Sequence, residues 1–159
     1  MVDAAFDVRF ALLGDVPHLA DTLVAWYERE WFEYYGPGGP GDARANVQEC
    51  MDATDLPVCL VAMASDGTPM GAVTLRERSF SHQELTPWVG ALLVEPSHRR
   101  KGVGAALVGA AEDEARRRRF QTLHMATDSA HSIAKLRGWR AFDTAESGHG
   151  PVTVYDIGL

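Results

Sequence analysis

Residues 88–104 read Trp-Val-Gly-Ala-Leu-Leu-Val-Glu-Pro-Ser-His-Arg-Arg-Lys-Gly-Val-Gly, and this stretch decides the fold. Its first part, residues 88–94, is continuously apolar, which is typical of a strand buried on both faces. Pro96 ends that strand, and the pattern predicts a helix that begins near Gly102. The buried stripe of this helix is expected to be Val103, Leu107, Ala110 and Ala111. A buried strand, a short basic turn and a helix therefore follow one another.

The turn between that strand and helix has the composition of an anion site. It holds three cationic residues and two glycines: Arg99, Arg100, Lys101, Gly102 and Gly104. Glycines let a phosphate approach the main chain closely, and the unpaired amides of a helix start add partial positive charge. The P-loop pattern is absent, and the dinucleotide fingerprint fails because Leu107 stands where its third glycine is required. We therefore expect a phosphate site of another class.

The rest of the chain predicts a mixed α/β fold (α+β), in which a sheet that is antiparallel at first contains one βαβ crossover. Strands are expected at residues 6–12, 57–64, 68–78, 88–94, 122–126, 139–144 and 152–157. A first helix, capped by Asp15, carries its apolar face from Val16 to Trp31, and a second, capped by Asp42, reaches about Met51. A short helix covers residues 129–136. The length predicts a single domain over residues 1–159.

Composition excludes several classes of protein. The formal net charge of −7 does not suit nucleic-acid binding, which depends on releasing counterions from phosphates. The run Arg116–Arg119 follows three acidic residues by four positions, so it is expected to be a self-paired surface. No apolar stretch is long enough for a membrane span, and the chain start does not have the pattern of a signal peptide. Cys50 and Cys59 have no metal-ligand spacing, and we expect a reduced, cytoplasmic protein without a metal.

The pattern Arg99-x-x-Gly102-x-Gly104, directly after an apolar strand that ends Leu-Val-x-Pro, resembles the acetyl-CoA motif of the GNAT superfamily of N-acetyltransferases, Arg/Gln-x-x-Gly-x-Gly/Ala. Downstream, residues 123–127 and 134–139 are similar to the strand, short helix and Gly-aromatic turn of that family. The resemblance covers essentially the whole chain. It implies a sheet of about seven strands, splayed in the middle and flanked by about four helices.

The resemblance also implies an activity. Acetyl-CoA would be the cosubstrate, no metal would be needed, and the acetyl group would pass directly to a primary amine on a small molecule or peptide. The pyrophosphate would lie on the amides of residues 100–105, and the pantetheine arm along the strand that ends at Val94. The implied cofactor residues are Leu92, Leu93, Val94, Arg99, Arg100, Lys101, Gly102, Val103, Gly104 and Ala105. Dimers are common in this family, so a homodimer is possible.

The proton-transfer groups depart from the pattern of the family. Many members carry a tyrosine four residues before the glycine of the Gly-aromatic turn, where this chain has Ala134; His131 and Ser132 are the nearby substitutes for this acid. Some members carry a glutamate early in the strand before the motif, where this chain has Trp88. Candidate bases are Glu77, His82 and Glu84, and we rank Glu77 first because a strand would hold it more rigidly.

The acceptor is expected to meet the end of the first helix, which in this family often shapes the acceptor pocket. An aromatic group lies there: Trp26, Trp31, Phe32, Tyr34 and Tyr35. Glu30 and Glu33 could attract an amine, and residues 36–41 could form a mobile lid. We take Glu33, Tyr34 and Trp88 as candidate substrate-binding residues. The alternative function is an acyl-CoA-binding module without efficient turnover, because the acid and the base are unassigned.

Overall fold

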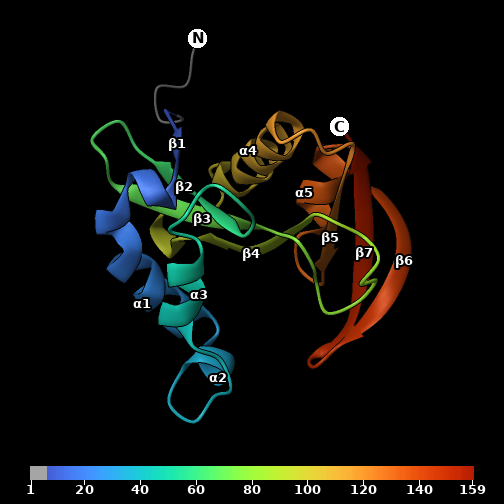
Figure 1. Cartoon of the computed structure of the whole chain (residues 1–159), viewed down its shortest axis with the longest axis horizontal. Coiled ribbons are helices and arrows are strands. Elements are labelled where there is room, and N and C mark those ends of the chain that lie inside the picture. Colours follow the sequence, from blue (N-terminus) through green and yellow to red (C-terminus); the bar gives the residue numbers. More distant parts are fainter. Residues whose placement is uncertain (1–6) are drawn as a thin grey trace.

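The computed structural model describes residues 7–159, in which seven strands form one sheet with the order β1-β2-β3-β4-β5-β7-β6 (Figure 1). The strands are β1 (Arg9–Leu12), β2 (Val58–Met63), β3 (Pro69–Arg76), β4 (Trp88–Val94), β5 (Thr122–Thr127), β6 (Arg140–Ser147) and β7 (Gly150–Gly158). Only β4 and β5 pair in parallel among the described residues. The predicted mixed sheet with one crossover is confirmed; Phe6, where the first strand was predicted to begin, lies outside the described residues.

Residues 7–159 contain five α-helices rather than about four. They are α1 (Ala20–Glu30), α2 (Phe32–Tyr35), α3 (Ala43–Glu49), α4 (Val103–Arg117) and α5 (His131–Leu136). The extra helix arises because Trp31 leaves helical geometry, with φ −119° and ψ 55°, and so separates α1 from α2. In Figure 1, α4 lies on one side of β2, β3 and β4, and α1 and α3 lie on the other.

Two of the predicted helix starts had different outcomes. Asp42 caps α3 as predicted, because its Oδ1 accepts a hydrogen bond from the amide of Ala45 at 3.0 Å. The prediction that Asp15 caps the first helix is wrong. Asp15 ends a short 3-10 helix (Leu13–Asp15), a second one (Pro17–Leu19) follows, and α1 begins only at Ala20. Proline fits the first turn of that second 3-10 helix, since it needs no amide hydrogen there.

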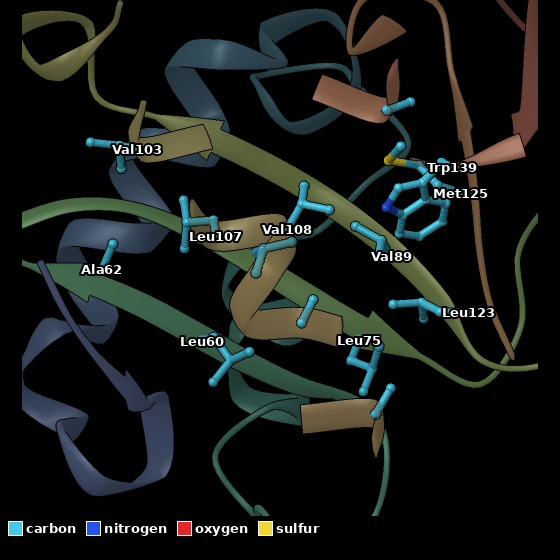
Figure 2. Packing of buried hydrophobic residues seen from close by; sticks show 14 of the residues in the cluster. Leu60, Ala62, Leu75, Val89, Val103, Leu107, Val108, Leu123, Met125 and Trp139 are labelled. Atoms are coloured by element: carbon cyan, nitrogen blue, oxygen red, sulfur yellow. The ribbon is translucent and has the colours of Figure 1, made fainter. Parts of the chain in front are cut away.

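The core has one hydrophobic cluster on each face of the sheet. Figure 2 shows the α4 side, where Val103, Leu107 and Val108 pack over residues of β2, β3, β4 and β5. The other cluster joins α1 and α3 to the opposite face and includes Leu23, Tyr27, Val47, Cys59, Val61, Ala72 and Leu93. Leu107 is fully buried, so truncating it to alanine would cost about 2–5 kcal/mol. These two layers hold the strand β4 between them.

The arginine run at the end of α4 pairs in part with acidic residues of its own helix, but of the predicted pairs four residues apart only Glu114 with Arg118 forms, because Glu112 binds Arg137 instead. Asp113 pairs with Arg116 at 2.8 Å, and the buried Glu114 binds both Arg117 and Arg118. Within residues 7–159, no helix has both the length and the apolar character to cross a membrane.

Candidate functional site

The turn between β4 and α4 leaves a row of backbone amides without partners. A 3-10 helix (Pro96–His98) follows β4, Arg100 has a φ of 63°, and Gly102, the N-cap of α4, has a φ of 84°. A left-handed conformation favours glycine at the cap, because a Cβ atom there would be strained. The amides of residues 100–105 have no recorded acceptor among the described residues. They form the donor set expected of an anion site.

Of the three cationic side chains at this turn, one is paired with other residues and two are not. Arg99 is engaged although 45% of its side chain is exposed: its Nε donates to the carbonyl of Val94 at 2.8 Å, and its Nη2 donates to Glu30 at 2.6 Å. A second pair, Arg29 with Glu95 at 3.7 Å, also ties the end of α1 to the turn. Arg99 therefore fixes the turn against α1, and the exposed Arg100 and Lys101, which form no ion pair within residues 7–159, supply the unpaired positive charge.

Gly104 lies in the first turn of α4 and allows close packing of three elements. A Cβ atom there would lie 3.0 Å from Cδ1 of Ile133 on α5 and 3.6 Å from Cγ2 of Val94. The end of β4, the start of α4 and α5 therefore meet at this glycine. A large substitution at Gly104 would press on α5 as well as on any bound anion, so it is a poor probe of binding alone.

The parallel strands β4 and β5 part immediately after they meet. Their register contains only Trp88 opposite His124 and Val89 opposite Met125, after which the strands splay. The next residues of β4 contain a bulge, since the register with β3 shifts between Ala72 and Thr74 and Ala91 has a φ of 46°. The edge of β4 that faced β5, which includes residues 92–94, is thereby left without a strand partner. An extended chain could pair with it there.

Glu77 and His131, the predicted catalytic residues, lie in different settings. Glu77 is exposed and follows the last residue of β3, so the strand does not hold it as we had expected. His131 is exposed at the start of α5, and its Nδ1 lies 2.7 Å from the hydroxyl of the buried Tyr155. Ala134 is fully buried in the α4-side cluster. Tyr155 thus brings a phenol beside His131, three residues before Ala134, and this pair was not predicted from the sequence because it spans two elements.

The other candidate base residues belong to the loop between β3 and β4. His82 Nε2 lies 2.8 Å from Oδ2 of Asp143 on β6, and its Nδ1 lies 2.9 Å from the hydroxyl of Ser81. The bond from His82 is the main reason that the pKa of Asp143 lies below its usual value. Glu84 is exposed. The loop is therefore fastened to β6 through His82, while Glu84 lies in solvent.

The cysteines do not supply a nucleophile. Burial raises the pKa of Cys50 to about 11 and raises the pKa of Cys59 further. Because the thiolate is the reactive form, neither side chain is activated near neutral pH.

On the acceptor side, the three predicted residues separate. Glu33 and Tyr34 are exposed on α2, and the ring of Tyr34 meets Tyr35 edge-on at 4.7 Å. Trp88 is only 1% exposed, and its indole donates to the carbonyl of Leu85 at 2.7 Å. Its side chain therefore packs inside the protein and presents no surface to a substrate in this structure.

The Gly/Pro segment 36–41 is hydrogen-bonded to itself and to α2. The amide of Gly39 donates to Gly36, and the amide of Gly41 donates to Tyr34, at 2.9 and 2.8 Å. A shallow, open depression elsewhere on the surface is lined by Gly14, Asp15, Gln48, Met51, Asp52 and Ala53. None of those residues belongs to the turn, to β4 or to β5. Residues 7–159 contain no group of three or more His, Cys, Asp or Glu side chains that could hold a metal ion.

Comparison with known proteins agrees with this geometry. The fold matches that of a GCN5-related N-acetyltransferase from Kribbella flavida, with a TM-score of 0.75 and 18% identity over 96% of this chain and 98% of that chain. An aminoglycoside 6'-N-acetyltransferase complexed with coenzyme A gives a TM-score of 0.75 and 17% identity over 94% and 96%. The aminoglycoside 6'-N-acetyltransferase of Enterococcus faecium gives 0.70 and 18% over 89% and 91%. At these identities the likeness shows the fold.

No curated protein matches the chain by sequence. Residues 21–138, however, match the sequence family described as the acetyltransferase (GNAT) family, and this range includes β4, the turn, α4, β5 and α5. More than half of the chain lies within the match, and the splayed strands and the turn with free amides are inside it. The chain therefore belongs to the acetyltransferase (GNAT) family.

Proposed function

We propose that this protein is an N-acetyltransferase that transfers the acetyl group of acetyl-CoA directly to a primary amine on a small molecule or peptide. The observation that carries the proposal is the row of unpartnered amides at residues 100–105, next to the open edge of β4. A diphosphate needs such donors, and an amide-bearing arm needs such an edge. Family membership supplies the reaction class.

The chain would contribute mainly positioning and polarisation. Amides of the turn, with Arg100 and Lys101, would hold the diphosphate, while the main chain of residues 92–94 would align the pantetheine arm. A backbone amide near the bulge at Ala91 would polarise the thioester carbonyl, since fixed donors there need no rearrangement during the reaction. The amine must lose a proton before it attacks, and the departing thiolate must gain one.

For these proton transfers we propose Glu77 as the base and His131 as the acid. The hydroxyl of Tyr155 at 2.7 Å orients the His131 ring. Replacing a general acid or base typically costs about 10²–10⁴-fold in rate. We expect Glu77→Gln and His131→Gln to lower kcat within that range while the Kd for acetyl-CoA stays within about twofold. Single-turnover thiol release and calorimetry measure the two quantities; if kcat is unchanged in either variant, the residue has no such role.

The function is tested with acetyl-CoA and a panel of amines. Calorimetry should detect binding of acetyl-CoA well below about 1 mM, which corresponds to about −4 kcal/mol. Release of free thiol should then depend on an amine, and the panel should include an aminoglycoside, a polyamine, free amino acids and a peptide N-terminus. If no heat is seen at that concentration, the proposal is wrong.

The buried Ala134, in the place of the usual tyrosine, favours one alternative, an acyl-CoA-binding module without efficient turnover. Binding without amine-dependent thiol release would support that module instead.

A further inference from the structure

A charged cluster lies at the point where β4 and β5 separate, on the face that carries α1 and α3. We name it the Arg76 cluster, and it consists of Tyr35, Asn46, Glu49, Thr74 and Arg76. Arg76 and Thr74 come from β3, Tyr35 from α2, and the other two from α3. The proposed function uses none of these residues, and the sequence predicted a role only for the aromatic group that includes Tyr35.

The register of the sheet places this cluster at the splay. Thr74 pairs with Gly90 and Arg76 with Trp88, while the last pair between β4 and β5 is Val89 with Met125. Gly90 is thus the first residue of β4 beyond that pair. A Cβ atom at Gly90 would lie 3.2 Å from Oγ1 of Thr74 and 3.7 Å from Cδ of Arg76. Because Gly90 has no side chain, the space beside its main chain is bordered by the hydroxyl of Thr74 and the stem of Arg76.

The ion pair in the cluster is loose and accessible. Nη1 of Arg76 lies 3.7 Å from Oε2 of Glu49, which exceeds hydrogen-bond distance, and the two side chains are 30% and 52% exposed. Asn46 donates to the hydroxyl of Tyr35 at 2.6 Å. Burial raises the pKa of Tyr35, and the nearby Arg76 opposes that rise. A guanidinium and a carboxylate thus face one another without a direct hydrogen bond, beside neutral polar groups.

The buried residue of the cluster, Thr74, has a polar atom without a hydrogen-bond partner among the described residues. That atom, the hydroxyl oxygen Oγ1, is itself buried. Buried hydroxyls normally have a partner, so an unpaired one marks a place where water or a ligand group completes the structure.

On these observations we infer that the acceptor is a small zwitterion, such as an α-amino acid, whose carboxylate binds Arg76 while its amine lies on the Glu49 side, over Gly90. A guanidinium recognises a carboxylate through two parallel hydrogen bonds, and a carboxylate attracts an ammonium group. A cation without a carboxylate would be repelled by Arg76. The half-buried rings of Trp31 and Tyr35, whose centroids lie 6.4 Å apart, offer apolar contact to a side chain.

This inference rests on the proposed function and adds the substrate class. The ammonium form of the acceptor loses one proton to the base Glu77, which releases it to solvent, and the nitrogen then bonds to the acetyl carbon. The carbon–sulfur bond breaks with its electron pair going to sulfur, and a second proton from nitrogen ends on sulfur, through the acid and base groups. The products are the N-acetylated zwitterion, now an anion, and free CoA thiol.

The test compares phenylalanine with phenylalanine amide and phenethylamine, which keep the ring and the amine but lack the carboxylate. For the wild type we expect kcat/KM for phenylalanine to exceed that for both analogues by at least about tenfold; methionine and its amide serve as a second set. Arg76→Gln should lower kcat/KM for phenylalanine by about 10–100-fold, the range for a lost charged hydrogen bond. It should not lower kcat/KM for phenethylamine, because the removed guanidinium repels that cation, and it should leave the Kd for acetyl-CoA within about threefold.

Arg44→Gln is the matched control. It removes the same positive charge as Arg76→Gln, but from an arginine that pairs with Asp21 at 3.0 Å on the surface. It should leave all three acceptors unchanged. The inference is overturned if the wild type acetylates the amide and phenethylamine with the same kcat/KM as phenylalanine. It is also overturned if the wild type binds acetyl-CoA but acetylates no amino acid. In both cases the other amines of the panel still test the proposed function. Absence of acetyl-CoA binding would instead defeat the proposed function.

Discussion

At the scale of single residues, the unpaired charge of the turn comes from Arg100 and Lys101, because Arg99 is engaged with Glu30 and Val94. Sequence alone makes the three cations equivalent. The structure separates them, since only contacts between α1 and the turn, residues far apart in the chain, reveal which arginine is structural. The motif residue Arg99 thus holds the amides in place, while its neighbours can meet an anion.

This division of roles predicts the effect of reversing one charge. Lys101→Glu should weaken acetyl-CoA binding by about 10–100-fold, because an exposed cation beside the diphosphate is replaced by an anion. The melting temperature of the free protein should stay unchanged, since Lys101 has no recorded partner within residues 7–159. Calorimetry and thermal denaturation measure the two quantities. An unchanged Kd would mean that the diphosphate lies elsewhere.

At the scale of secondary structure elements, α5 is joined to α4 by a buried carboxylate. Glu112 is 4% exposed and accepts hydrogen bonds from Arg137 at 2.7 and 3.1 Å and from the indole of Trp139 at 3.1 Å. The guanidinium of Arg137 lies against Gly109, where a Cβ atom would come within 2.9 Å of it. This bidentate pair is therefore one of the contacts that hold α5 against α4, beside the packing of Ile133 and Ala134.

Removing the charge of Glu112 should destabilise the fold. We expect Glu112→Gln to lower the free energy of unfolding by about 2–4 kcal/mol, because it leaves a partly buried guanidinium without its counter-ion. Asp113→Asn is the control, since Asp113 is exposed and its pair with Arg116 is worth at most about 1 kcal/mol. Urea denaturation compares the two. Equal losses in both variants would show that the buried pair has no special weight.

The loop between β3 and β4 is joined to β6 by His82 and Asp143, and this link should depend on pH. The folded pKa of Asp143 lies below its ordinary value near 3.9, so the link stabilises the protein above that value. The stabilisation is lost as pH falls through the lowered folded pKa. Asp143→Asn should therefore show a lower urea midpoint than the wild type at pH 7, and the two midpoints should converge in acid. A constant difference across pH would contradict this account.

Features of the fold could be predicted from the sequence where their cause lies in neighbouring residues. The order of strand, turn and helix from Trp88 to Gly104 was predicted correctly, because apolar continuity, a proline and two glycines specify it without outside help. The burial of Trp88 agrees with the predicted buried strand and not with its proposed role in substrate binding. The break at Trp31 and the bulge at Ala91 were missed. Each depends on packing between elements, which periodicity does not report.

The candidate site divides in the same way. Its anion half lies in one continuous segment and could be found from a motif, whereas its acceptor half is assembled from β3, α2 and α3. A signal for the second half was present, since Thr74 and Arg76 are polar positions with period two in an otherwise apolar strand. Alternation places both side chains on one face, but nothing in the sequence says that the face meets α3.

At the scale of the whole molecule, the sheet consists of two antiparallel parts, β1–β4 and β5–β7, that meet through only two residue pairs. Figure 1 shows the second part standing across the first, with α4 and α5 beside the junction. A ligand that lay along β4 and on the turn would add contacts where the two parts are joined most weakly. Binding should therefore stabilise the junction more than the periphery.

Linkage gives the size of that effect. At about 100 times its Kd, acetyl-CoA should raise the free energy of unfolding by about 2.7 kcal/mol, and Lys101→Glu at the same concentration should gain much less. Hydrogen exchange should show the added protection in residues 88–106 and 122–136, with little change in the β6–β7 hairpin turn. Protection confined to α1–α3 would place the ligand away from the splay. Protection across the junction would instead mean that the cofactor completes the sheet which β4 and β5 leave open.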